Sequence, residues 1–157
     1  MLSAAFVLDD IVEVIEVGLS EIPTQSRMAE TVRDVLAWSQ EISDWEASRD
    51  RLEEKYGHYN STHTPNNAAL VLQGLLYGEG AFTRTICLAV MGGWDTDCNG
   101  ATVGGLFGLT GRAIPEAWTR PWAGRVGVSL AGHSEFDLDD LVHRTVAVAD
   151  ELGREAA

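Results

Sequence analysis

Cysteine, proline and long apolar runs are all scarce in this 157-residue chain. Its two cysteines, Cys87 and Cys98, are too few for a disulfide framework or a four-thiolate zinc site. Four prolines and 16 glycines exclude a low-complexity linker. Because no stretch of about 18 consecutive apolar residues occurs, we expect no transmembrane helix. With 45% hydrophobic and 22% charged residues, the composition is that of a globular protein.

Basic residues are also few. Eleven lysines and arginines stand against 24 acidic residues, which gives a formal net charge of −13. Such a charge repels nucleic acid and anionic lipid and attracts cations, so we expect no direct nucleic-acid binding and no membrane partner. An anionic substrate would need local positive charge, supplied by a metal ion or by helix N-termini.

The first residues lack a basic region, and the apolar stretch 1–8 is followed directly by Asp9-Asp10. A secretory signal peptide begins with positive charge, so this segment matches one poorly. Together with the low cysteine content, this predicts a cytoplasmic protein.

The apolar residues recur at helical spacing along most of the chain. The pattern predicts helices in segments 11–19, 28–36, 68–77, 82–90, 98–109 and 138–152. Segment 68–77 is apolar on almost every side, which predicts a buried helix. Residues 110–135 look irregular, and no segment shows the alternation of a strand. The fold class is therefore all-α, as a single domain over 1–157 or as the C-terminal half of a larger all-α domain.

Several residues are suited to ending or starting these helices. Asp9-Asp10 is a plausible N-cap, and Ser43 with Glu46 has the spacing of a capping box. Gly57 is suited to end the helix that follows Ser43, in the left-handed conformation. Gly92-Gly93 should end the helix of segment 82–90.

The segment that is densest in chemistry is Gly92-Gly93-Trp94-Asp95-Thr96-Asp97-Cys98-Asn99-Gly100. The two glycines permit a tight turn after a helix, and a sharp turn would let the carboxylates of Asp95 and Asp97 converge. Carboxylate oxygens suit Mg²⁺ or Mn²⁺ better than zinc. The alternative, about equally favoured for an isolated Asp-x-Asp, is that Asp97 caps the following helix and Asp95 is simply solvated.

A stripe of glycines follows the two aspartates. Gly100, Gly104 and Gly108 share one face of the predicted helix, with Gly105 beside them. Such a face either packs closely on another helix or lets the backbone approach a ligand. Close packing is the more favoured interpretation of the glycines taken alone.

This combination resembles the C-terminal metal motif of the ADP-ribosylglycohydrolase family. The resemblance rests on segment 92–97 with the glycine-rich helix after it, on His63-Thr64-Pro65-Asn66-Asn67 with the helix that follows, and on Tyr77-Gly78-Glu79-Gly80. It covers most of residues 1–130, in the order of the family's C-terminal half. The tryptophan inside the motif is similar to that of a bacterial branch of the family.

The resemblance implies an all-α helical bundle with a binuclear Mg²⁺ or Mn²⁺ centre. It also implies hydrolysis of the glycosidic bond at the anomeric carbon of ADP-ribose, in modified proteins or small conjugates. Both aspartates of the motif are metal ligands in the family, which carries over to Asp95 and Asp97. The next residue is often a threonine whose hydroxyl contributes, but here it is Cys98. A thiol is a poor ligand for Mg²⁺, so either Cys98 or a water in its place would complete this set.

The family's other ligands come from an Asp-Asp-Thr-like motif in its N-terminal half. The only paired aspartates here, Asp9-Asp10 and Asp139-Asp140, lack the following threonine. We therefore expect the chain to be the C-terminal portion of the fold and to be inactive alone. Its expected partners are an ADP-ribosyl conjugate and a separate N-terminal half or a second copy. No catalytic carboxylate is evident.

Five residues are candidates for binding the substrate: His63, Asn66 and Asn67 before the buried helix, and Gly93 and Trp94 in the motif. The alternatives are that Asn66 caps a helix beginning near Ala68 and that Trp94 only packs. A different class of function also remains open, namely a non-catalytic helical module that binds ADP-ribose or metal.

Overall fold

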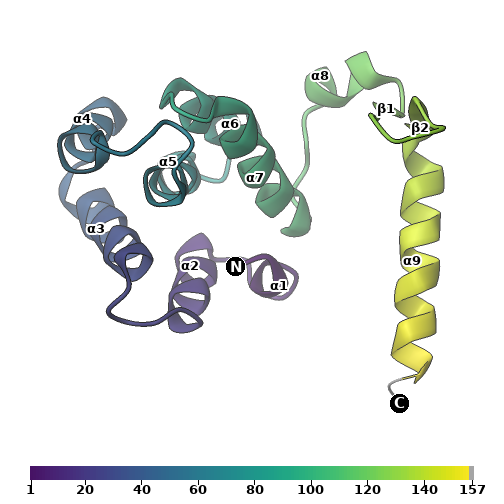
Figure 1. Ribbon diagram of the computed structural model, residues 1–157, viewed down its shortest axis with the longest axis horizontal. Coiled ribbons are helices and arrows are strands. Elements are labelled where there is room, and N and C mark those ends of the chain that lie inside the picture. The colour runs from purple at the N-terminus through teal and green to yellow at the C-terminus, as the bar shows by residue number, and fades with distance from the viewer. Residues whose placement is uncertain (156–157) are drawn as a thin grey trace. The chain divides into compact units, whose positions relative to one another are not determined.

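The computed structural model describes residues 1–155 and is mainly helical, with one small two-stranded sheet (Figure 1), which confirms the all-α fold class. The chain divides into two compact units, Met1–Ala113 and Ile114–Ala157. The first unit is built from α1 (Leu2–Ala5), α2 (Ile11–Ser20), α3 (Arg27–Glu41), α4 (Trp45–Tyr56), α5 (Thr64–Tyr77), α6 (Phe82–Met91) and α7 (Thr96–Leu109). Within the described residues, no helix is both long enough and apolar enough to cross a membrane.

Side-chain caps fix where several of these helices begin. The Oδ1 atom of Asp10 accepts hydrogen bonds from the amides of Val12 and Glu13, as the Asp9-Asp10 pair predicts. The capping box at Ser43 is wrong by one residue: the N-cap of α4 is Asp44, whose Oδ2 accepts from the amide of Ala47 at 2.9 Å. Both residue types cap well, and the backbone path into α4 decides between them.

Helix α5 is the centre of the first unit. Figure 1 shows it between the α3–α4 pair and the α6–α7 pair, and it packs against all four. As predicted, it is buried on almost every side. Even Gln73 is fully buried, and its amide nitrogen donates to the carbonyl and hydroxyl oxygens of Ser48 on α4. A buried polar group with such partners fixes the register between two helices.

The ends of two helices differ from the sequence prediction. Gly57 ends α4 as expected, but with φ −65° it is right-handed. A Cβ on Gly57 would lie 2.5 Å from the carbonyl oxygen of Glu53, so lack of space, not a positive φ, requires glycine there. Helix α5 begins at Thr64, ahead of the predicted start at Ala68, because Pro65 can occupy the first turn of a helix.

The second unit consists of α8 (Glu116–Thr119), the 3-10 turn η1 (Arg120–Trp122), strands β1 (Arg125–Gly127) and β2 (Glu135–Asp137), and α9 (Leu138–Glu155). The strands were not predicted. They pair antiparallel, with Val126 opposite Phe136, and at three residues each they are too short for alternation to be visible in the sequence. Helix α9 starts at Leu138 as predicted and exposes an apolar set of side chains: Leu138, Val142, Val146, Val148 and Leu152.

Candidate metal centre and its cavity

The turn between α6 and α7 carries the two motif aspartates. Helix α6 ends at Met91 with Gly92 as its C-cap, as the Gly-Gly pair predicts. The next two residues are left-handed, Gly93 with φ 86° and Trp94 with φ 55°. Glycine adopts this conformation freely, whereas a residue with a Cβ pays about 1–2 kcal/mol for it. The sharp reversal therefore contains one strained residue, Trp94.

The reversal brings the three predicted ligands together. A carboxylate oxygen of Asp95, one of Asp97 and the sulfur of Cys98 all lie within 4.8 Å of one another. Asp95 is half-buried, while Asp97 and Cys98 are exposed. The spacing of side chains at the start of a helix would not by itself bring Asp95 and Asp97 together. Their convergence depends on the turn.

Asp97 is not the N-cap of α7, so that alternative from the sequence is wrong. The helix begins at Thr96, which places Asp95 at the N-cap position and Asp97 in the first turn. The side chain of Asp95 makes no capping hydrogen bond there. Both carboxylates lie at the N-terminus of α7, the positive end of the helix dipole.

Cys98 is held in its neutral form. A hydrogen bond to the carboxylate of Asp95 raises the pKa of the Cys98 thiol, and the negative charges of Asp95 and Asp97 raise it further. A neutral thiol is a weak ligand for a hard cation, whereas carboxylate oxygens are good ones. The donor set thus fits Mg²⁺ or Mn²⁺ through the two aspartates, with water completing the coordination.

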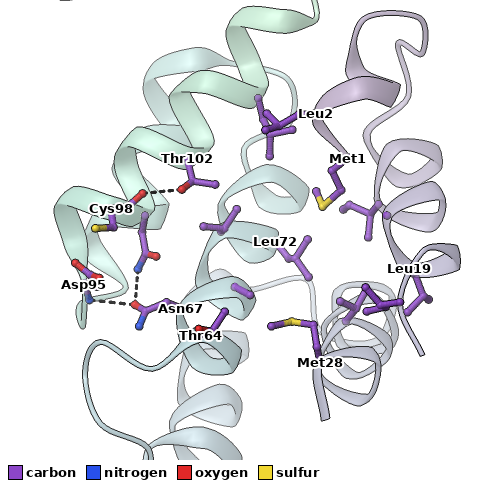
Figure 2. A pocket seen from close by; sticks show the side chains of 18 of the residues that line it. Met1, Leu2, Leu19, Met28, Thr64, Asn67, Leu72, Asp95, Cys98 and Thr102 are labelled. Atoms are coloured by element: carbon purple, nitrogen blue, oxygen red, sulfur yellow. Dashed lines mark hydrogen bonds between the residues drawn. The ribbon is translucent and has the colours of Figure 1, made fainter. Parts of the chain in front are cut away.

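Asn67 connects this turn to α5 (Figure 2). Its Oδ1 atom accepts from the backbone amide of Asp95 at 3.1 Å and from the Nδ2 of Asn99 at 2.8 Å. Its own Nδ2 donates to the carbonyls of Ser61 and His63, at 2.8 and 2.7 Å. Both N–H groups and the oxygen are therefore occupied, and the side chain ties the loop before α5 to the start of α7.

A cavity of about 510 Å³ is lined by Asp95 and Cys98 but not by Asp97. This volume is in the range of small-molecule sites. Figure 2 shows its two sides: Asp95, Cys98, Asn67 and Thr102 at one end, and apolar side chains such as Met28 and Leu72 at the other. The cavity therefore combines a polar end that bears negative charge with a larger apolar wall.

The family model for ADP-ribosylglycohydrolase matches residues 1–153. This chain belongs to the ADP-ribosylglycohydrolase family. No protein of curated function and no solved structure matches the chain. The family assigned from the motif residues is thereby confirmed, while membership of a bacterial branch stays a prediction.

The five predicted substrate-binding residues of this family member occupy different places. His63 and Asn67 line the cavity. Asn66 points elsewhere: it is fully buried, and its Nδ2 donates to the carbonyl of Asn60 at 3.2 Å. It does not cap a helix at Ala68, because α5 has already begun. Gly93 and Trp94 lie outside the cavity lining, and Trp94 packs half-buried against the hydrophobic core.

The glycine stripe of α7 is used for packing at one end. A Cβ on Gly100 would lie 3.1 Å from Val90, and one on Gly104 would lie 3.3 Å from Ile86, so these two glycines let α7 approach α6 closely. A Cβ at Gly105 or Gly108 would have no heavy-atom neighbour within 4 Å among the described residues. Close packing is therefore the right interpretation for Gly100 and Gly104.

Sequence reasoning missed two residues of this centre. Asn99 is buried and gives Asn67 one of its hydrogen bonds. Arg49 on α4 contacts the turn, 43 positions before the residue to which it donates. Asn99 lies inside the recognised motif and could have been flagged there. Nothing in the sequence around Arg49 indicates its contact with the turn.

Proposed function

We propose that this protein acts as a hydrolase on the glycosidic bond at the anomeric carbon of ADP-ribose, in modified proteins or small conjugates. In this proposal Asp95 and Asp97 hold a Mg²⁺ or Mn²⁺ ion, and Cys98 contributes at most weakly. The observation that carries it is the convergence of two carboxylates, one of which lines a cavity of about 510 Å³, in a chain of this family.

The charge of the chain supports a role for a cation. ADP-ribose carries a pyrophosphate, and a protein with a net charge of −13 repels it unless the local charge is compensated. A bound divalent ion would supply that compensation and could polarise substrate oxygens or activate a water. The chain's own contribution is to fix the two carboxylates and to shield one side of the cavity with apolar side chains.

The structure changes the role that we assign to Asn67. Both of its N–H groups already donate to backbone carbonyls, so they are not available to the ribose or phosphate of a substrate. Asn67 therefore serves as a positioning residue for the turn. His63 lines the cavity with its side chain exposed, and it remains the stronger candidate for a substrate contact.

Metal binding is the first test of the proposal. Titration calorimetry with Mn²⁺ should show binding to the wild-type protein and a large loss of affinity in Asp95→Asn and Asp97→Asn. Because these substitutions keep the side-chain size, the folded structure should survive. Cys98→Ala is the matched control and should bind Mn²⁺ about as well as the wild type. Unchanged binding in both aspartate variants would refute the proposed ligands.

Hydrolysis is the second test. We propose that the 157-residue chain alone releases little ADP-ribose from arginine- or serine-linked peptides, since this part of the family's site lacks an evident general acid or base. A separate N-terminal half, or a second copy of the chain, is the proposed partner. Adding a matching N-terminal half should restore Mn²⁺-dependent release in the wild type but not in Asp95→Asn. Binding of ADP-ribose with no release under any condition would favour a non-catalytic module.

A further inference from the structure

Arg49 reaches from α4 to the turn that carries the proposed metal ligands. Its Nε atom donates to the carbonyl of Gly92 at 2.6 Å. Its guanidinium carbon lies 4.4 Å from the ring centre of Trp94, a cation–π distance. The side chain is only 18% exposed. One arginine thus contacts the residues on both sides of Gly93.

These two contacts act at the strained part of the turn. Gly92 is the C-cap of α6, so its carbonyl accepts no hydrogen bond within the helix. A positive charge is favourable here, at the negative end of the helix dipole. Trp94 is held in the left-handed conformation although it has a side chain. A planar, charged group that bonds to Gly92 and stacks on Trp94 opposes relaxation of Trp94 to an unstrained conformation.

A surface ion pair does not explain these contacts. The Nη1 atom of Arg49 lies 2.9 Å from a carboxylate oxygen of Glu53, one turn further along α4. The side chain of Glu53 is 52% exposed, and such exposed pairs contribute little to stability. The ion pair can orient the guanidinium, but the contacts that restrain another element are those to Gly92 and Trp94.

We propose that Arg49 is a positioning residue for the metal centre: it clamps the Gly92–Trp94 turn so that Asp95 and Asp97 converge. The inference rests on the proposed function, since it concerns affinity for the cation that those aspartates would hold. It assigns to α4, an element outside the motif, control over the geometry of the site.

The direction in which Mn²⁺ affinity changes when Arg49 is replaced distinguishes a positioning role from a purely electrostatic one. Arg49 carries a positive charge near a cation site, so its removal would strengthen cation binding if charge alone mattered. A clamp predicts the opposite. Residues that orient metal ligands typically change metal affinity by about 10- to 100-fold when they are replaced. We therefore expect Mn²⁺ to bind at least about tenfold more weakly to Arg49→Met.

The experiment compares Arg49→Met with Arg51→Met by titration with Mn²⁺. Arg51 lies on the same helix, is 54% exposed and pairs with Glu54, so its replacement changes the net charge equally without touching the turn. Arg51→Met should bind Mn²⁺ as well as the wild type or slightly better. Arg49→Lys keeps the charge but loses the planar guanidinium, and it should bind nearly as weakly as Arg49→Met.

A second readout uses no metal. Hydrogen exchange followed by mass spectrometry should show faster exchange of amides in segment 92–99 for Arg49→Met and Arg49→Lys, and wild-type rates for Arg51→Met. This readout reports whether the turn has loosened. If Arg49→Met does not fold, both measurements, Mn²⁺ affinity and hydrogen exchange, are made on Arg49→Lys instead.

The possible failures are distinguishable. Wild-type affinity for Mn²⁺ or tighter binding in the Arg49 variants, or unchanged exchange in segment 92–99, would overturn the inference while the proposed function stands. A wild-type protein that binds no Mn²⁺ would overturn the proposed function and, with it, the role of Arg49 in metal affinity.

Discussion

Asn67 offers the sharpest test of how the centre is held together. The change Asn67→Ala removes four hydrogen bonds, two donated to the carbonyls of Ser61 and His63 and two accepted from Asp95 and Asn99. At about 0.5–1.5 kcal/mol each, their loss would lower the free energy of unfolding by about 2–6 kcal/mol. Because Asn67 lines the cavity, water can replace some of these bonds, so we expect about 3 kcal/mol.

The assay is urea denaturation followed by circular dichroism, with Asn66→Ala as the matched control. Asn66 is the preceding residue of α5 and is also buried. Among residues 1–155, its side chain makes one hydrogen bond, donated to the carbonyl of Asn60, and its Oδ1 has no partner. Removing it costs one bond and leaves a small void, about 1–2 kcal/mol in total. The control thus matches Asn67 in residue type, helix and burial.

The same two variants can also be compared by their affinity for Mn²⁺. Asn67→Ala frees the amide of Asp95 and should weaken Mn²⁺ binding about tenfold or more. Asn66→Ala should leave Mn²⁺ binding unchanged. If Asn67→Ala destabilises the protein no more than Asn66→Ala, or binds Mn²⁺ with wild-type affinity, then Asn67 does not organise the turn and the reasoning is wrong.

Further predictions concern two glycines and one tyrosine. Gly92→Ala should destabilise the protein by about 1–3 kcal/mol in thermal melts, because its Cβ would lie 2.5 Å from the side chain of Leu70. Gly105→Ala should instead stabilise it by about 0.5–1 kcal/mol, since a Cβ there has open space and alanine favours a helix; a lower melting temperature would contradict this. Burial and a hydrogen bond to Asp34 raise the pKa of Tyr56 above 10.0, so the unfolded chain loses this proton first and stability should fall as the pH rises above about 10. In Tyr56→Phe the pH titration of stability should be flatter above pH 10, and an equally steep fall would assign the effect to other groups.

Local patterns in the sequence predicted most of the helices, because the apolar spacing and the end signals of a helix involve residues that are close in the sequence. The apolar spacing of segment 68–77 predicted the buried helix α5, and the pair Gly92-Gly93 predicted the end of α6. The errors are also local. Ser43 and Asp44 are adjacent and equally suited to capping, so sequence alone could not choose between them.

The candidate site was predictable only in part, because some of its residues are close together in the sequence and others come from distant helices. Asp95 and Asp97 are close in sequence, and the turn that joins them could be inferred from the glycines before them. Asn67 and Arg49 contact this turn from α5 and α4, and such contacts depend on how helices pack. Asn66 and Asn67 were singled out as candidate substrate donors, but both N–H groups of Asn67 already donate to backbone carbonyls, which the sequence alone could not show.

The link that Asn67 makes also bears on the order in which the site assembles. It joins residues that are 28 and 32 positions apart, so it cannot form until the chain between them has closed into a loop. Helices α5 and α7 can in principle form before that closure, since many proteins have compact acid states that retain secondary structure without fixed packing. In such a state the turn would lack its anchor. Binding of a cation would then indicate that α5 has packed against α7. A chain with its full helix content but without this packing would not bind the cation.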